Sequence, residues 1–318
     1  MTPCWRVNRG TTMNIRNVRW SLMALGAAAA LATTSAQAAW TFDSTGNSST
    51  YTYNGSTAGD PTVSLTGFYV ANNASTGVAS GNWASSAGNV GTSGNANSSY
   101  GVTSNGAYGI GMYTGSDNGS PYHAVDNSQN TEGVLLNFGS SKVTLTSIGL
   151  GFTSNGTTSN CVVSTDSSCY KADTAAATVT VDLAVYRWTG TAAPTLTGTA
   201  AGTMSGWELV SVLGDARTDA APTYDKNVIN AAGKTSSWWL ITAYNSGLAG
   251  VSGAANVDNG NDYFKLLGVQ GTKCSGNVTS SGTCDVGRAG VPEPASLALT
   301  SVALLGMFGL RRRKAKVA

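Results

Sequence analysis

The chain of 318 residues has one histidine, His123, and no catalytic motif built around it. The sequence lacks a G-x-S-x-G elbow, an H-E-x-x-H zinc motif and a G-x-x-x-x-G-K-[ST] phosphate loop. A Ser-His-Asp triad would have to use His123 with Asp126 or another acid, and their closeness in sequence does not create that geometry by itself. We therefore expect His123 to be a hydrogen-bonded loop residue, and we predict no catalytic residue.

Two carboxylates suffice for glycoside hydrolysis, and they need no local motif. Glu132, Asp182 and Glu208 fall in or beside predicted strands, but nothing in their spacing selects a pair. A secreted two-carboxylate glycan hydrolase therefore stays open as a minor alternative to a protein without enzymatic activity.

Several oxygen-rich segments have ligand types that suit Ca²⁺. They are Asp126, Asn127 and Glu132, then Asp117 with Asn118, and the run 258–262. None has the ordered spacing of a calcium loop, so Asx turns between strands are the favoured interpretation. We expect no cofactor, and a structural Ca²⁺ held by the first of these groups is the alternative.

Aromatic residues cluster in the second half of the chain, and a flat aromatic surface can stack against sugar rings. The candidates for such a platform are Tyr186, Trp188, Trp207, Trp238 and Trp239. Because these residues alternate with apolar neighbours, packing in a core is the favoured interpretation. A carbohydrate-binding module remains the main alternative function.

The elements that must position these residues are predicted to be strands. Gly, Ser, Thr and Asn dominate the composition, whereas the helix formers Glu, Lys, Gln and Arg are scarce. Apolar residues alternate in Val181, Leu183 and Val185, which predicts one buried strand face. Between Leu145 and Ile148 the alternating apolar residues change from odd to even positions, which predicts a β-bulge. Residues 44–106 are expected to form long loops with a few short strands.

Other short alternating runs, joined by Gly- and Asn-rich turns, complete the fold prediction. We predict an all-β, antiparallel β-sandwich or jelly-roll-like body with long Gly/Ser/Thr/Asn-rich loops. An N-terminal signal helix and a C-terminal hydrophobic helix are expected to flank this body.

The N-terminus has the three parts of a secretory signal. Two arginines precede a short apolar run over 21–31, and an Ala-x-Ala site follows it. The predicted signal-peptidase site comprises Ala36, Ala38 and Ala39, with cleavage after Ala38. Met13 is a plausible true start, because translation from it gives a basic region of ordinary length.

The C-terminus combines a proline-bracketed acid, an apolar run and a basic cluster. Pro292 and Pro294 flank Glu293, which predicts an extended segment open to a peptidase. The apolar run over 295–310 would give roughly 24 Å of helix at ~1.5 Å per residue, enough for a short anchor. The basic residues that would stop translocation are Arg311, Arg312, Arg313 and Lys314.

This tail resembles the PEP-CTERM sorting signal of bacterial surface proteins. The resemblance rests on Pro292-Glu293-Pro294, the apolar run and the terminal arginines, about 28 residues in all. It implies that an exosortase reads the tail, so that these three residues are substrate residues. It also implies a surface or matrix protein associated with exopolysaccharide or biofilm. A plain single-pass C-terminal anchor is the alternative.

The charge distribution divides the chain into three segments, predicted as a signal peptide (1–38), an exported domain (39–290) and a sorting segment (291–318). The middle segment has 9 basic and 15 acidic residues, which gives a net charge of −6. A nucleic-acid partner is not expected, because phosphate binding needs a basic face. The expected partners are signal peptidase, an exosortase, the inner membrane in transit and exopolysaccharide. The predicted final location is the cell surface or the extracellular space.

The exported domain has four cysteines, and an even number in an exported chain favours disulfides. The two close spacings favour Cys161–Cys169 and Cys274–Cys284, because closing a short loop costs little entropy. The other two pairings stay open. A metal site is the alternative, although the sequence has no C-x-x-C and no histidine nearby.

Overall fold

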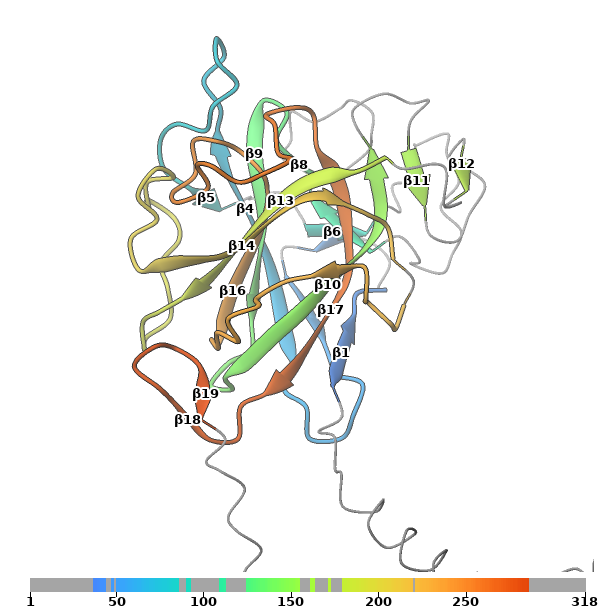
Figure 1. Ribbon diagram of the computed structural model, residues 1–318, viewed down its shortest axis with the longest axis vertical. Coiled ribbons are helices and arrows are strands. Elements are labelled where there is room, and N and C mark those ends of the chain that lie inside the picture. The colour runs from blue at the N-terminus through green and yellow to red at the C-terminus, as the bar shows by residue number, and fades with distance from the viewer. Residues whose placement is uncertain are drawn as a thin grey trace, which may run out of the picture. The chain divides into compact units, whose positions relative to one another are not determined.

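The fold is seen in a computed structural model (Figure 1). It describes residues 37–43, 47–48, 50–85, 90–92, 109–112, 124–154, 161–163, 171–172, 179–219 and 221–285. These residues form strands, turns and loops, and none of them lies in a helix. Within these ranges, therefore, no helix is long and apolar enough to cross a membrane.

One sheet has ten strands, in the order β12-β11-β10-β17-β7-β6-β2, with β1 and β8 also paired to β17 and β15 to β10. Its strands are β1 (Ala38–Thr41), β2 (Asn47–Ser48), β6 (Val90–Thr92), β7 (Ile110–Met112), β8 (Val125–Asp126), β10 (Val143–Ser154), β11 (Cys161–Val163), β12 (Lys171–Ala172), β15 (Asn227–Val228) and β17 (Tyr263–Lys273). All these pairs are antiparallel except β11 with β12.

The second sheet has seven strands, in the order β14-β13-β16-β9-β4-β3, with β5 paired to β4. Its strands are β3 (Tyr51–Tyr53), β4 (Val63–Ala71), β5 (Ala84–Ser85), β9 (Asn130–Asn137), β13 (Val181–Trp188), β14 (Trp207–Ala216) and β16 (Trp238–Ala243). All pairs in it are antiparallel, so the described part bears out an all-β, antiparallel body.

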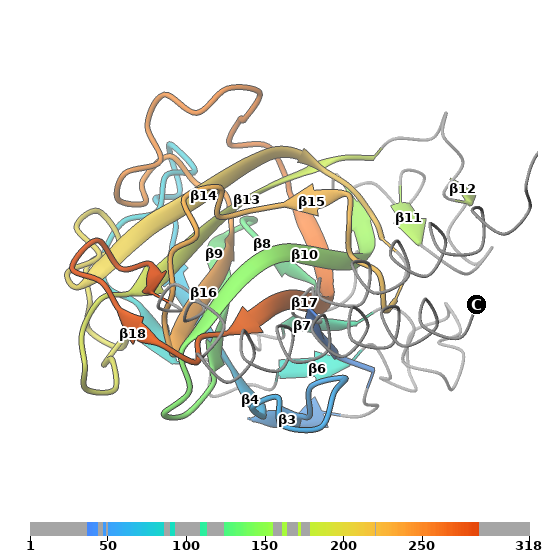
Figure 2. The same cartoon turned by 60° about the horizontal axis from the view of Figure 1, so that its bottom comes forward.

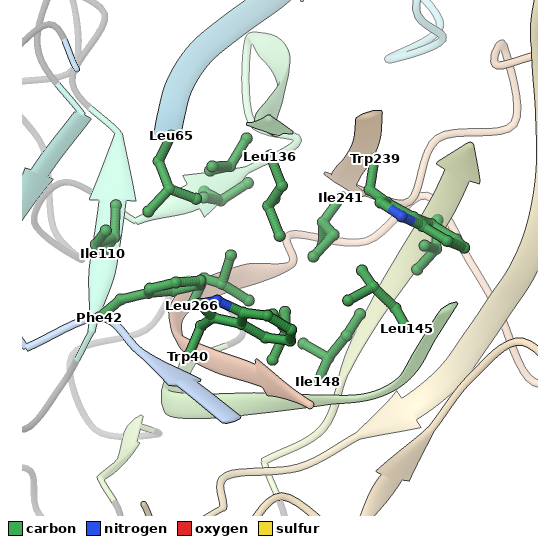
Figure 3. Close-up of a cluster of buried hydrophobic side chains, with 14 of the residues drawn as sticks. Trp40, Phe42, Leu65, Ile110, Leu136, Leu145, Ile148, Trp239, Ile241 and Leu266 are labelled. Atoms are coloured by element: carbon green, nitrogen blue, oxygen red, sulfur yellow. The ribbon is translucent and has the colours of Figure 1, made fainter. Parts of the chain in front are cut away.

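Side chains from both sheets meet in one hydrophobic core, which Figure 3 shows in close-up. Leu136 and Ile241 of the seven-stranded sheet face Leu145, Ile148 and Leu266 of the ten-stranded sheet, and all five are fully buried. Because such side chains leave water completely, each stabilises the fold by about 1.5–3 kcal/mol. This core joins the two sheets face to face.

A second apolar layer covers part of the outer face of the seven-stranded sheet. Strand residues such as Leu135 and Leu240 meet loop residues such as Trp83, Met204 and Leu248 in it. Strands of this sheet are thus buried on both faces along much of their length. Trp83 lies in the region 44–106, where long loops are expected from the sequence, whereas Met204 and Leu248 lie in loops farther along the chain.

The predicted bulge in β10 is confirmed. Its ladder with β17 shifts register between Leu145 and Ser147, so that both Leu145 and Ile148 reach the core. The apolar residues occupy odd positions up to Leu145 and even positions from Ile148, and the extra residue of the bulge turns both sets of side chains to the same face of the sheet. The described residues of the region 44–106 form five strands, β2 to β6, and four of these strands have two or three residues.

A third, two-stranded sheet closes the described chain. It consists of β18 (Asn277–Val278) and β19 (Cys284–Asp285), which pair antiparallel. In Figure 2 this hairpin lies beside the end of β17, from which the chain enters it.

Candidate functional site

Many of the predicted site residues lie outside the described residues. They are Ala36, Asp117, Asn118, His123, Cys169, Pro292, Glu293, Pro294, Arg311, Arg312, Arg313 and Lys314. The predictions made for them therefore stay predictions.

Ala38 and Ala39, which flank the predicted leader cleavage, begin β1. Their side chains are 1% and 7% exposed, and Ala38 pairs with Gly271 of β17. The Ala39 N–H donates to Ser56 Oγ at 3.0 Å, and the Ala39 carbonyl accepts from Ser56 N at 2.8 Å. In the folded chain the bond between these residues is thus inside a sheet.

The predicted pair Cys274–Cys284 is confirmed, with its Cα atoms 5.6 Å apart. It closes the β18–β19 hairpin, which Thr235 N and Lys234 Nζ hold to the body by hydrogen bonds of 2.7 Å to two of its carbonyls. Cys161 lies in β11, and its predicted partner is outside the described residues.

An ion-pair network lies next to this hairpin. Glu208 Oε2 accepts hydrogen bonds from Arg187 Nε, at 2.8 Å, and from Arg187 Nη2, while Lys234 Nζ lies 3.0 Å from Glu208 Oε1. Burial opposes ionisation of Glu208, but the hydrogen bonds from Lys234 and Arg187 outweigh it and lower the pKa of the carboxyl. Gly282 of the hairpin touches the guanidinium so closely that any side chain there would collide with it. The network therefore fixes the hairpin and leaves Glu208 unsuited to act as a free acid.

A buried carboxylate network lies at the other end of β13, and Asn127 connects its parts. Asn127 Nδ2 donates to Asp262 Oδ2 at 3.0 Å and to the Tyr244 carbonyl at 2.9 Å. Its Oδ1 accepts from Asp262 N at 2.9 Å. Asp262 Oδ1 in turn accepts from Asp182 N at 2.8 Å. The loop before β9 is thereby tied to the loop before β17.

The two acids of this network hold their protons more tightly than usual. Burial, with added repulsion from Asp182 and Asp258, raises the pKa of Asp262 to about 8. Burial also raises the pKa of Asp182, although backbone N–H groups of Asp215 and Asp258 donate to its carboxylate. Asp262 is therefore largely protonated at neutral pH.

The oxygen atoms proposed as calcium ligands accept hydrogen bonds from backbone N–H groups. Glu132 Oε2 accepts from Asp126 N at 3.3 Å, and Asp126 Oδ1 accepts from Ser128 N at 2.8 Å. Asp258 Oδ1 accepts from Gly260 N at 2.5 Å, which is the Asx turn expected there. Within the described ranges no three His, Cys, Asp or Glu residues form a group that could hold a metal ion.

The three strand acids do not come together as a hydrolytic pair. Asp182 and Arg187 are five positions apart on β13, and Arg187 pairs with Glu208, so Asp182 and Glu208 are separated by roughly 17 Å along the sheet. Glycosidases need about 5–10 Å. By strand alternation Glu132 faces the inter-sheet core with Val134, whereas Asp182 faces the opposite side of the sheet.

The five predicted aromatic residues separate into buried and half-buried positions. Trp239, Tyr186 and Trp207 are 0%, 1% and 8% exposed, so packing in a core is confirmed for them. Trp207 also forms a tryptophan row with Trp188 and Trp238, across β14, β13 and β16. Trp188 pairs directly with Trp207. On its other side Arg187 pairs with Trp239, and because the strands are antiparallel this register places Trp188 beside Trp238.

The tryptophan row lies at the border of the outer apolar layer. Trp207 is 8% exposed, whereas Trp188 and Trp238 are half-buried. The ring centroids of Trp188 and Trp207 are 5.5 Å apart and the rings are inclined by 56°, so this pair does not form the coplanar platform that was the alternative to core packing.

Polar side chains continue the row on the neighbouring strands. Trp238 pairs with Asn137 of β9, Asn137 with Ser64 of β4, and Ser64 with Thr52 of β3. No sequence pattern points to these three polar residues, because they lie far from the tryptophans in the chain and only the register of the sheet aligns them.

Comparison of the chain with protein-family models, with curated proteins and with solved structures gave no match.

Proposed function

We propose that the protein is an exported bacterial surface or extracellular-matrix protein without enzymatic activity, sorted by an exosortase at Pro292-Glu293-Pro294. The observation that carries this proposal is the order of its segments: a basic and apolar leader, a β-rich body, the proline-bracketed motif, an apolar run and terminal arginines. In this proposal the body is a jelly-roll-like β-sandwich associated with exopolysaccharide.

Features of the body support this role. The Cys274–Cys284 pair is typical of proteins that fold in an oxidising compartment. β19 ends at Asp285, seven positions before Pro292, so the body closes on a cross-linked hairpin just ahead of the motif. Such a cross-link would secure the end of the folded body seven positions before the processing motif.

Intact mass of the full chain, recovered from the surface and medium of an exosortase-bearing host, tests the sorting step. The expected product ends near Pro292 and starts after Ala38. Deletion of Pro292–Pro294 is expected to leave the C-terminal segment attached and the protein in the membrane fraction. Pro194→Ala, in a loop of the body, is the control and is expected to be processed normally. Unchanged processing of the deletion variant would refute the proposal.

A further inference from the structure

We propose that the outer face of the seven-stranded sheet binds an uncharged polysaccharide along the tryptophan row and its polar continuation. This inference rests on the proposed association with exopolysaccharide and names the surface that makes it. The six aligned positions are Trp207, Trp188, Trp238, Asn137, Ser64 and Thr52, one from each of β14, β13, β16, β9, β4 and β3.

The row has the dimensions of a sugar chain. Neighbouring strands are about 4.8 Å apart, so three tryptophans on adjacent strands span about 10 Å, a length on the scale of a disaccharide. The C–H faces of sugar rings stack on indole rings, and indole combines a large apolar surface with a polar N–H. Because Trp207 is only 8% exposed, a glycan lying across the strands would stack on the half-buried indoles of Trp188 and Trp238 and then meet three hydrogen-bonding side chains.

Trp188, at the centre of the tryptophan row, is held in a fixed position. Its Nε1 donates to the Ala192 carbonyl at 2.7 Å, and its carbonyl accepts from Ser236 Oγ at 2.7 Å. Gly190 and Gly206 lie against the ring so closely that a Cβ at either position would overlap it. A half-buried ring that is fixed before binding loses little conformational entropy on stacking, which favours affinity.

The polar half of the row carries the groups that recognise hydroxyls. Asn137 Oδ1 accepts from Gly139 N at 2.8 Å, which orients the amide, and no described residue accepts from its Nδ2. Ser64 Oγ and Thr52 Oγ1 are 3.3 Å apart, and each hydroxyl can donate and accept. Asn137 and Ser64 are half-buried and Thr52 is exposed, so solvent reaches this half of the row.

The charge of the surface selects the type of glycan. None of the six positions carries a charged side chain, and the segment 39–290 has 9 basic and 15 acidic residues. An acidic polysaccharide would meet no counter-charge in the row, and the segment 39–290 as a whole has a net charge of −6, which repels a polyanion. An uncharged glycan is therefore the occupant that fits, in preference to an anionic polymer.

Retardation of the purified full chain in native gels that contain soluble polysaccharides tests this inference. Uncharged polymers of glucose, mannose and galactose form one arm, and polygalacturonate, an anionic polymer, forms the other. We expect at least one uncharged polymer to retard the chain and the anionic polymer to leave it unchanged. No retardation by any uncharged polymer, or stronger retardation by polygalacturonate, would overturn the inference.

Single-residue variants then locate the surface. Trp238→Ala and Asn137→Ala are expected to weaken binding by about tenfold, whereas Trp188→Phe keeps an aromatic ring and is expected to lose less. Val228→Ala, at an exposed apolar position of the other sheet, is the matched control and is expected to bind normally. Near-ultraviolet circular dichroism checks that each variant is folded. Unchanged binding by both folded Trp238→Ala and Asn137→Ala would refute the assignment.

Glycan binding is distinguishable both from self-association of the chain and from the sorting step. If the row instead joined two copies of the chain, sedimentation would show a dimer that Trp238→Ala dissociates, and the glycan assignment would be wrong. The gel measures binding by purified protein, so it does not depend on C-terminal processing. A chain that binds glycan but is not processed would contradict only the sorting step, and a chain that is processed but binds no uncharged glycan would contradict only the glycan assignment.

Discussion

Ala38 of β1 pairs with Gly271 of β17, so the strand that begins at the predicted leader junction runs beside the strand that enters the disulfide hairpin. The residue after Ala38 in the same strand is also buried, and Trp40 and Phe42 then enter the core. The two ends of the body are thus joined by one ladder.

Leader cleavage is expected to precede the docking of β1, because a peptidase cannot bind a bond that is paired inside a sheet. Trp40 is 0% exposed and its Nε1 donates to the Pro61 carbonyl at 2.7 Å, so Trp40→Ala should destabilise this docking by about 3–5 kcal/mol. Signal peptidase added to folded full-length precursor should cleave Trp40→Ala faster than the unaltered chain. Val228→Ala is the control, and equal rates for all three chains would contradict this prediction.

The disulfide is expected to stabilise the body through its hairpin. Replacing Cys274 and Cys284 together by serine should lower the unfolding free energy by about 2–3 kcal/mol, because the unfolded chain gains the entropy of the opened loop. Urea denaturation of the oxidised protein measures this loss. Ser275→Ala, in the same loop, should have little effect, and an equal loss in both variants would show that the cross-link itself contributes nothing.

Removal of the charge at Glu208 should leave the Arg187 guanidinium buried with a weaker partner. We expect Glu208→Gln to lower the unfolding free energy by about 1–3 kcal/mol, less than for a fully buried pair because Glu208 is partly exposed. Since its pKa is lowered in the fold, its contribution is present above the ordinary pKa of 4.5 and is lost as the pH falls through the folded value. Chemical denaturation at pH 7 and pH 3, with Asp225→Asn as an exposed control, measures both effects. If Glu208→Gln were as stable as Asp225→Asn at pH 7, the predicted contribution of the ion pair would be wrong.

Asp262 should make the protein less stable as the pH rises from about 4 to about 8. Its pKa is about 8 in the fold against 3.8 ordinarily, so the folded state binds more protons than the unfolded state across this window. The expected loss of unfolding free energy is about 1–3 kcal/mol between pH 5 and pH 8. Asp262→Asn should flatten this dependence in a series of thermal denaturation curves, whereas Asp225→Asn should keep it. If the stability of Asp262→Asn still falls between pH 5 and pH 8 as steeply as that of the unaltered protein, Asp262 is not the cause and the prediction is wrong.

Lys265 should make the protein more stable as the pH rises, which is the opposite of the effect of Asp262 and occurs at higher pH. Its side chain is 4% exposed, with Nζ 5.4 Å from the centroid of the Phe152 ring, and burial lowers its pKa to about 7. The unfolded state then binds more protons between about pH 7 and 10.5, so unfolding free energy rises with pH in that window.

Lys265→Met removes the amine and keeps most of the side-chain volume, so it should stabilise the protein at pH 7 by about 1–3 kcal/mol and remove this rise. Denaturation midpoints at pH 7, 8.5 and 10 measure both effects, with Lys142→Met as the control. A loss of stability at pH 7 in Lys265→Met alone would contradict the interpretation of Lys265 as a costly buried amine.

Local patterns in the sequence were sufficient for the class of fold and for some details. Alternation identified the buried face of β13, and the parity change between Leu145 and Ile148 identified the bulge in β10. The close spacing of Cys274 and Cys284 identified their pairing. These features depend on neighbours within a few residues, so strand geometry and short-loop entropy are enough to predict them.

Alternation within β17 is compatible with either of two buried faces, Phe264 with Leu266, or Lys265 with Leu267 and Val269. The core takes Phe264, Leu266 and Val269, because the ladder with β10 shifts register within this stretch. A shift of register depends on both strands, so alternation within one strand could not have predicted it.

By itself the sequence determined that the body is β-rich, with strand faces set by alternation, and it predicts a leader and an anchor at the two ends. Only the tertiary structure decided which distant residues became neighbours: Asn127 with Asp262 across 135 positions, and Trp188 with Trp238 and then Asn137. The physical reason is that alternation fixes the face on which a side chain lies, whereas strand order and register fix what lies beside it. Strand order and register follow from packing the whole core at once.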